Sequence, residues 1–195
     1  MKNLRMIIFL MIISTVCVLL LSGANLVYER ASEVFNVRLF GVILNLFDIE
    51  AGEDQIKKVF TENFNTRIVG GKTYYISENK DKGVIVFKTQ GPGLWSTIEL
   101  VVGIYPDFEN LYGIRVVSQA ETPGLGGRIV EPEFQARFKN VEIKPSLRIV
   151  KFASGPNEVD AVTGASKTSK ALEVIINKAI AEAEQAFKEN VKEKK

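Results

Sequence analysis

The chain opens with a long apolar segment, which sets it apart from the rest of the sequence. Residues 6–24 are 19 positions without a charged side chain. As a helix they would be about 28 Å long, close to the hydrocarbon thickness of a bilayer. The pattern predicts a transmembrane anchor over residues 6–27. A cleaved signal peptide is the alternative, because Ser22, Gly23 and Ala24 form a small-residue triplet typical of a cleavage site.

After the anchor, apolar residues recur at helical spacing in two stretches. Residues 31–46 and 54–64 both repeat apolar side chains every three or four positions, as an amphipathic helix does. Together they predict a helical connector over residues 28–70, between the anchor and a folded domain.

From residue 73 the apolar period changes to that of strands. Stretches rich in Val, Ile, Tyr and Phe are separated by Asn, Asp, Lys, Gly and Pro, a pattern typical of an antiparallel meander. They cover residues 74–76, 83–89, 98–104 and 114–118. Pro132 then predicts the start of a short helix before Asn140, and residues 147–152 predict a further strand.

The last element is an amphipathic helix over residues 168–188. Leu172, Ile176 and Ile180 mark its apolar stripe, so we expect it to pack on the sheet. Residues 71–188 therefore predict one α+β domain, an antiparallel sheet covered by helices. A charged tail follows at residues 189–195.

Composition excludes several kinds of chemistry. The chain has 195 residues, of which 46% are hydrophobic, enough for one compact domain and a short appendage. It contains no histidine and one cysteine, Cys17, so disulfides within the chain, Ser-His-Asp catalysis and zinc or haem sites built on histidine are excluded. We expect no metal site, and any redox chemistry requires an organic cofactor.

The net charge of +2 comes entirely from Lys2 and Arg5, which precede the apolar segment. By the positive-inside rule, residues 1–5 lie in the cytoplasm and the folded domain lies outside the cytoplasmic membrane. The remaining charges balance, so the domain offers no basic face for nucleic acid. The lipid bilayer is the first expected partner.

The strongest chemical signal is the run of residues 160–169, Asp-Ala-Val-Thr-Gly-Ala-Ser-Lys-Thr-Ser, placed directly before the long helix. Free N–H groups at a helix start carry partial positive charge and bind phosphates. Thr163, Ser166 and Thr168 add hydroxyl donors, and Lys167 adds charge. The alternative is that a hydroxyl of this run only caps the helix.

Two further stretches have unusual composition. Residues 120–128 hold three glycines and one proline, which specify an irregular loop that other groups approach closely, or else an ordinary turn. Residues 91–96, Gly-Pro-Gly-Leu-Trp-Ser, contain the only tryptophan of the chain, Trp95. A lone tryptophan is more often part of a core than of a cofactor site.

In this order along the chain, the three stretches resemble the FMN-binding domain family. Asp160, Thr163, Gly164 and Ala165 match its flavinylation motif, in which a flavin transferase attaches FMN through its phosphate to a threonine after the Gly-Ala pair. That position holds Ser166, which has the same nucleophilic oxygen without the methyl group. The resemblance therefore implies FMN held covalently by a phosphodiester to Ser166.

The same resemblance assigns the second stretch to the isoalloxazine site. It implies that Glu121 and Thr122 hydrogen-bond polar edges of the flavin and that Leu125 packs on the ring. Gly124 and Gly126 would leave space for the ring.

The third stretch would then supply a wall of the same pocket. The resemblance implies that Leu94 and Trp95 lie there, in place of a role for Trp95 in the core. Thr168 would add a hydroxyl near the phosphate. The fold would have to bring all three stretches together.

Within this family, one N-terminal span before a compact domain resembles the G subunit of Rnf electron-transport complexes. The alternative is the C subunit of sodium-pumping NADH:quinone oxidoreductases, which is usually longer. The resemblance implies an electron carrier without substrate chemistry of its own, matured by a flavin transferase and partnered by other Rnf subunits. Two other hypotheses remain: a membrane-tethered interaction domain without flavin, and a free-standing surface flavoprotein.

Overall fold

The computed structural model describes residues 2–193, except for the side chains of residues 2–5, 26, 27, 29–33 and 191–193. It divides into two compact units, Met1–Leu39 and Phe40–Lys195. The described part of the first unit is helical throughout. It includes Met6–Asn25, which is long and apolar enough to cross a membrane, with a mean hydropathy of 2.7. A signal sequence would meet the same criterion.

The predicted anchor and the helix predicted over residues 31–46 form one continuous helix, α1 (Lys2–Leu46). This stretch contains no proline and only two glycines, Gly23 and Gly41. No residue therefore breaks the backbone hydrogen bonding between the two predicted segments.

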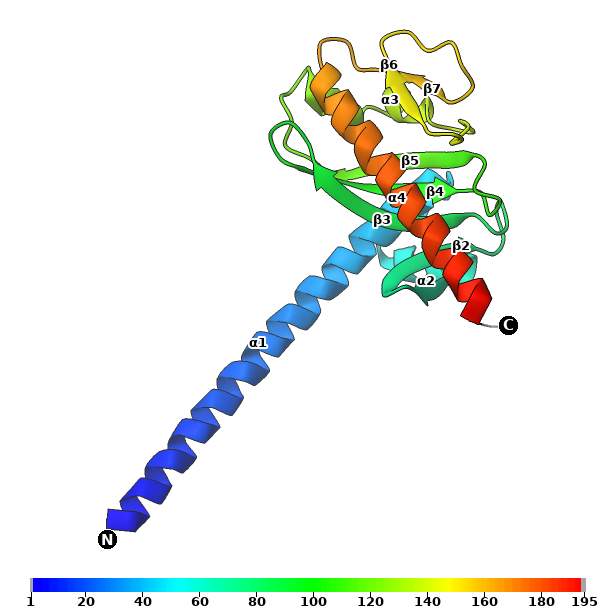
Figure 1. Cartoon of the computed structure of the whole chain (residues 1–195). Coiled ribbons are helices and arrows are strands. Elements are labelled where there is room, and N and C mark those ends of the chain that lie inside the picture. Colours follow the sequence, from blue (N-terminus) through cyan, green and yellow to red (C-terminus); the bar gives the residue numbers. More distant parts are fainter. Residues whose placement is uncertain (1, 194–195) are drawn as a thin grey trace. The chain divides into compact units, whose positions relative to one another are not determined.

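The second unit is built on a five-stranded antiparallel meander in the order β1-β2-β3-β4-β5 (Figure 1). The predicted α+β class and the antiparallel meander are confirmed. The strands are β1 (Phe64–Val69), β2 (Lys72–Ser77), β3 (Ile85–Pro92), β4 (Thr97–Ile104) and β5 (Leu111–Ser118).

The first strand corrects the expected helical connector over residues 28–70. Helix ends at Asn63 with α2 (Ile56–Asn63), which follows a short 3-10 turn, η1 (Glu53–Gln55). β1 pairs with β2 across Gly70 and Gly71, which both have positive φ, as a tight hairpin turn requires. Four of its six residues are exposed, so β1 lacks the alternation that reveals a strand.

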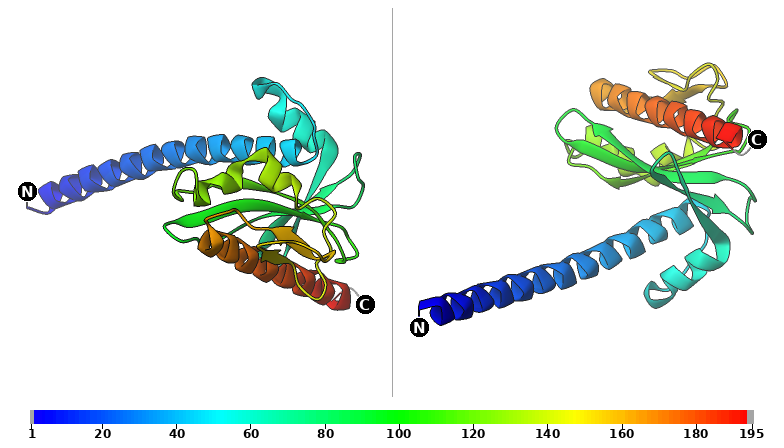
Figure 2. Two further views of the ribbon diagram at one scale, coloured as in Figure 1. Left: turned by 90° about the horizontal axis from the view of Figure 1, so that it is seen from above. Right: turned by 60° about the horizontal axis from the view of Figure 1, so that its bottom comes forward.

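Helix α4 (Ser166–Glu193) lies along one face of the sheet (Figure 2). Its predicted stripe is buried, with Leu172 and Ile176 at 0% exposure, and it packs mainly on β3. The helix begins two residues before its predicted start and continues into the tail expected at residues 189–195. The i,i+4 hydrogen bond from Gln185 to Glu189 supports that extension. Residues 194–195 lie outside the described part of the chain.

The opposite face of the sheet is covered by aromatic rings. Phe60 of α2 stacks on Phe40 at 3.9 Å between ring centroids and on Phe64 at 4.9 Å. Tyr75 of β2 meets Phe60 edge to face at 5.2 Å. The aromatic cluster formed by these four residues packs against β1 and β2 on the face opposite α4, so helical segments contact both faces of the sheet.

Short elements connect β5 to α4. They are η2 (Gly126–Val130), α3 (Pro132–Ala136) and a parallel pair of strands, β6 (Arg148–Val150) and β7 (Glu158–Asp160). Pro132 opens α3 as predicted, and β6 confirms the strand predicted over residues 147–152. The sequence pattern does not reveal β7, because three residues are too few to show a period.

Replacing Phe60 by alanine tests the aromatic cluster. Phe60 is 1% exposed, so Phe60→Ala should lower the free energy of unfolding by about 3–5 kcal/mol through the cavity left behind. Ile68→Ala in β1 is the control, because Ile68 is 72% exposed and its loss should change stability by less than about 0.5 kcal/mol. Urea unfolding of the full chain in detergent, followed by circular dichroism, measures both; equal losses would contradict the packing.

Candidate functional site

The three unusual stretches of sequence meet around one cavity of about 400 Å³ at the start of α4. Its volume lies within the range of roughly 300–1,000 Å³ found for small-molecule sites. The lining residues come from the β3–β4 turn, the loop after β5 and the first turn of α4. They are Leu94, Trp95, Glu121, Thr122, Leu125, Gly126, Gly164, Ala165, Ser166, Lys167 and Thr168.

The start of α4 supplies the positive end of this cavity. Ser166 is the first residue of the helix, so the N–H groups of the first turn lack carbonyl partners within the helix. Gly164 has a φ of +81°, which glycine adopts without strain, and this turns the chain into the helix. Lys167 adds a formal positive charge. The arrangement suits an anion, and a phosphate above all.

The hydroxyls of this turn hold loops in place. Because α4 begins at Ser166, Thr168 and Ser169 already lie inside its first turn. Thr168 Oγ1 donates to Glu121 Oε2 at 2.7 Å, and Ser169 Oγ accepts from the Val162 N–H at 3.1 Å. The alternative in which one of these hydroxyls caps the helix is therefore wrong.

Glu121 lies where the three stretches meet and is 4% exposed. Its Oε1 accepts hydrogen bonds from the N–H groups of Leu94 at 2.9 Å and Trp95 at 3.0 Å. Its Oε2 accepts the Thr168 hydroxyl. Both carboxylate oxygens are thus engaged by the protein itself.

The charge state of Glu121 follows from these contacts. Burial alone would raise the pKa of the carboxyl group. Hydrogen bonds from the Thr168 hydroxyl and from the N–H groups of Trp95, Ser96 and Leu94 outweigh burial and lower the pKa below its ordinary value. Glu121 is therefore ionised at neutral pH and acts only as an acceptor.

Two glycines permit the close approach of these stretches. A Cβ at Gly126 would lie 2.5 Å from Thr168 Oγ1, and a Cβ at Gly93 would lie 2.5 Å from Glu121 Oε1. The closely approached loop predicted from the glycine content is confirmed at Gly126. Gly124 differs, because its φ is +72° and nothing lies within 4 Å of a Cβ there.

Apolar side chains form the rim of the cavity. Trp95 is 72% exposed, Leu94 44% and Leu125 46%. The alternative in which the single tryptophan belongs to the core is wrong. Exposed apolar groups beside a cavity are typical of a surface that an apolar ligand or partner covers.

Some predicted residues lie outside the cavity lining. Asp160 ends β7, and its Oδ1 accepts the Ala153 N–H at 2.7 Å, so it holds the loop between β6 and β7. Thr163 is exposed. Neither these two residues nor Gly124 line the cavity.

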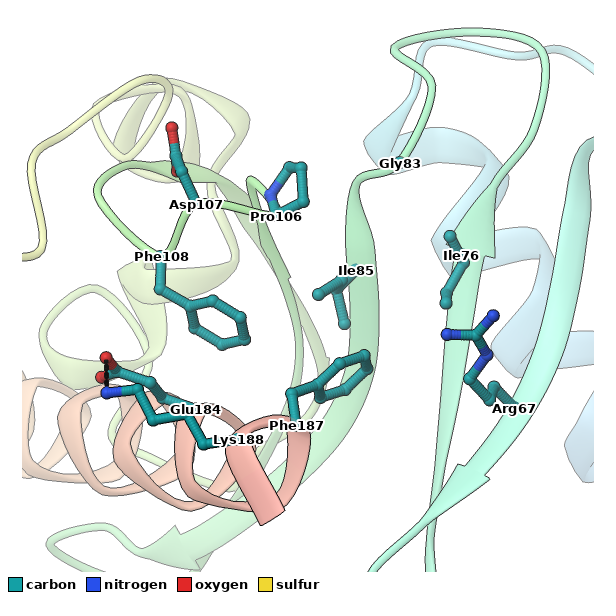
Figure 3. Close-up of a pocket in the computed structure, with 10 residues that line it drawn as sticks. All are labelled: Arg67, Ile76, Gly83, Ile85, Pro106, Asp107, Phe108, Glu184, Phe187 and Lys188. Carbon is teal, nitrogen blue, oxygen red and sulfur yellow. Dashed lines mark hydrogen bonds and ion pairs between the residues drawn. The ribbon is translucent and has the colours of Figure 1, made fainter. Parts of the chain in front are cut away.

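A larger cavity of about 700 Å³ lies near the end of α4 (Figure 3). Ile85, Phe108 and Phe187 form apolar walls, and Glu184 and Lys188 at its edge bind each other at 2.7 Å. None of the three stretches contributes to it, and it lacks a helix start for phosphate binding. Cavity volume therefore does not identify the candidate site. The hydrogen-bond donors that converge on the smaller cavity do.

Residues 93–181 match the family model described as FMN-binding domain. This match confirms the resemblance to the FMN-binding domain family that the three stretches indicate. The likeness extends to solved structures: the C subunit of the Na(+)-translocating NADH-quinone reductase from Parabacteroides distasonis superposes with a TM-score of 0.65 at 20% identity. It covers 77% of this chain and 90% of that structure, and at this identity it supports the fold alone.

The sequence relatives include two kinds of subunit. The C subunit of the Na(+)-translocating NADH-quinone reductase from Neisseria meningitidis is 40% identical over 98 residues, 47% of this chain and 38% of the relative. Its counterpart from Vibrio parahaemolyticus is 28% identical, over 66% of this chain and 51% of the relative. The chain thus spans about half or less of their length. The G subunit of the proton-translocating ferredoxin:NAD(+) oxidoreductase complex from Clostridium ljungdahlii is 32% identical over 61% of this chain and 63% of the relative.

Gly126→Ala tests the close approach at the site. The new methyl group would meet Thr168 and Glu121, so we expect a loss of about 1–3 kcal/mol in the free energy of unfolding. Gly52→Ala is the control, because nothing lies within 4 Å of a Cβ there. Urea unfolding of both variants measures the difference, and an unchanged Gly126→Ala would contradict the packing.

Proposed function

We propose that this chain is the electron-carrier subunit of a membrane-bound, ion-translocating ferredoxin:NAD oxidoreductase of the Rnf type. FMN is attached to it by a phosphodiester to Ser166. The observation that carries the proposal is the position of Ser166, as first residue of α4, on the wall of the cavity formed by the three stretches.

The phosphate end of the site explains the choice of Ser166. Attachment joins Ser166 Oγ to the FMN phosphorus and breaks the pyrophosphate bond of FAD, and the hydroxyl proton leaves with the AMP fragment. The partial positive charge of the helix start and the Lys167 ammonium group stabilise the phosphodiester that results. The flavin transferase is the partner required for this maturation.

The other end of the cavity suits the flavin ring. Leu94, Trp95 and Leu125 present exposed apolar surface there, and Thr122 lines the same cavity. When bound, FMN supplies the electron transfer, while the chain holds its phosphate and orients its ring.

The N-terminal half of α1 serves as the membrane anchor. Met6–Asn25 is the candidate span, and Lys2 and Arg5 precede it. The flavin domain then lies on the extracytoplasmic side of the cytoplasmic membrane, with the other Rnf subunits as partners.

A sodium-pumping NADH:quinone oxidoreductase is the second candidate complex. The higher identity to the C subunit from Neisseria meningitidis favours it. The extent of the alignment favours the Rnf type, because it covers 63% of the G subunit from Clostridium ljungdahlii and 38% of that C subunit.

Replacing the acceptor hydroxyl tests the attachment. We expect the full chain, co-expressed with a flavin transferase, to show in-gel flavin fluorescence and an FMN-sized mass gain on the peptide with Ser166. Ser166→Ala should abolish both signals, because no nucleophilic oxygen remains, and Ser166→Thr should retain them. Thr66→Ala is the control, since Thr66 is an exposed hydroxyl residue in β1 and lies outside the three stretches.

Three results would count against this proposal. Fluorescence that survives Ser166→Ala would remove Ser166 as the acceptor. A chain that never becomes fluorescent would favour the interaction domain without flavin. Flavin fluorescence in a chain that purifies from cells without membrane partners would favour the free-standing flavoprotein.

Cysteine labelling tests the side of the membrane. Lys58 is exposed in α2, so Lys58→Cys in a Cys17→Ser background offers a single thiol on the flavin domain. We expect a membrane-impermeant maleimide to label it in cells whose cytoplasmic membrane is intact, because the positive-inside rule places this domain outside. The Cys17→Ser parent is the control, and labelling only after lysis would reverse the topology.

A further inference from the structure

We propose that Glu121 is the positioning residue of this site, and that its carboxylate locks the β3–β4 turn and the first turn of α4 into one arrangement. The ring wall at Trp95 and the phosphate anchor at Ser166 then keep a fixed spacing. That spacing matters for flavin because of the proposed function, whereas the lock itself is a property of the chain.

The hydrogen bonds of Glu121 connect segments that are remote in sequence. Glu121 lies 26 and 27 residues from its two backbone donors, Trp95 and Leu94, and 47 residues from Thr168. One oxygen serves the turn and the other serves the helix. A single side chain thus bridges two elements that both line the cavity.

The glycines around Glu121 make room for this side chain. The position of a Cβ at Gly93 lies 2.5 Å from Glu121 Oε1, and that at Gly126 lies 3.0 Å from Glu121 Oε2. The resemblance assigns the space at Gly126 to the flavin ring. The structure instead fills that space with the carboxylate and with Thr168, so Gly126 serves the lock.

The charge of Glu121 strengthens each of these bonds. Its donors include the backbone N–H groups of Leu94 and Trp95 and the Thr168 hydroxyl, and a carboxylate binds such donors more strongly than a neutral amide does. Glu121→Gln can still accept both N–H groups and can donate to the Thr168 hydroxyl oxygen, so it keeps the shape and loses the charge. Glu121→Ala removes the lock and leaves the buried donors without an acceptor.

Trp95 offers a direct readout in flavin-free protein. It is the only tryptophan of the chain, and its backbone N–H donates to Glu121 Oε1. We expect the tryptophan fluorescence anisotropy to fall in Glu121→Ala and to be largely restored in Glu121→Gln. Glu158→Ala is the matched control, because Glu158 accepts N–H groups in another loop, from Ser154 and Gly155. Wild-type anisotropy in Glu121→Ala would overturn the proposal.

A double-mutant cycle separates the lock from general loss of stability. Thr168→Val removes the hydroxyl and keeps the shape of the side chain. Combined with Glu121→Gln, its effect on the free energy of unfolding should be clearly less than additive, because both changes weaken the same bond. Additive effects would overturn the proposal, and this pair of mild variants keeps the test valid even if Glu121→Ala does not fold.

Flavin loading completes the test. In the full chain co-expressed with a flavin transferase, Glu121→Ala should take up several-fold less flavin per chain than wild type, with Glu121→Gln in between and Glu158→Ala unchanged. Full loading of Glu121→Ala would contradict a positioning role. If wild type takes up no flavin, the proposed function fails, while anisotropy and the double-mutant cycle still decide the role of Glu121.

Discussion

The packing of α4 on the sheet is the contact on which the site depends. Its apolar stripe is buried against β3. This burial fixes the direction of the helix and the position of its first turn relative to the sheet. Gly91 permits the approach, because a Cβ there would lie 2.5 Å from Ile175 Cγ1 of the helix. The same stretch continues into the turn that carries Trp95. Core packing and site geometry are therefore set by one helix–strand contact.

Loops at one end of the strands β3, β4 and β5 supply the remaining walls of the site. The turn between β3 and β4 and the loop after β5 come together because β4 pairs with both strands. Ser96 Oγ accepts the Ala120 N–H at 2.8 Å, which links the two loops. Glu121 then ties both to α4. Loops on a rigid scaffold are where binding groups commonly gather, and here hydrogen bonds remove the mobility that such loops otherwise have.

The sequence predicts those features whose signal is local. The apolar stripe of α4, the strands β2 to β5 and the run of residues 160–169 each show a period or a composition that a short stretch of sequence reveals. β1 escapes such a short window of sequence because its exposed residues hide the alternation. Its pairing with β2 and the packing of Phe64 on Phe60 stabilise it. The partners of Glu121 escape as well, because a hydrogen bond across 47 residues depends on the finished fold. Resemblance suggests candidate site residues but not which of them contact each other.

The openness of the site bears on why the proposed cofactor would be covalently held. Trp95 is mostly exposed and the cavity, at about 400 Å³, lies near the lower end of the range for small-molecule sites. Under the proposed function, its walls would bury only part of a flavin ring and contribute limited affinity. A phosphodiester to Ser166 makes retention independent of that affinity. The ring can then keep one edge accessible, which is what an electron carrier between partner subunits requires. Under the proposed function, the open rim thus leaves the ring accessible to partner subunits, and the covalent phosphate keeps the cofactor bound despite that exposure.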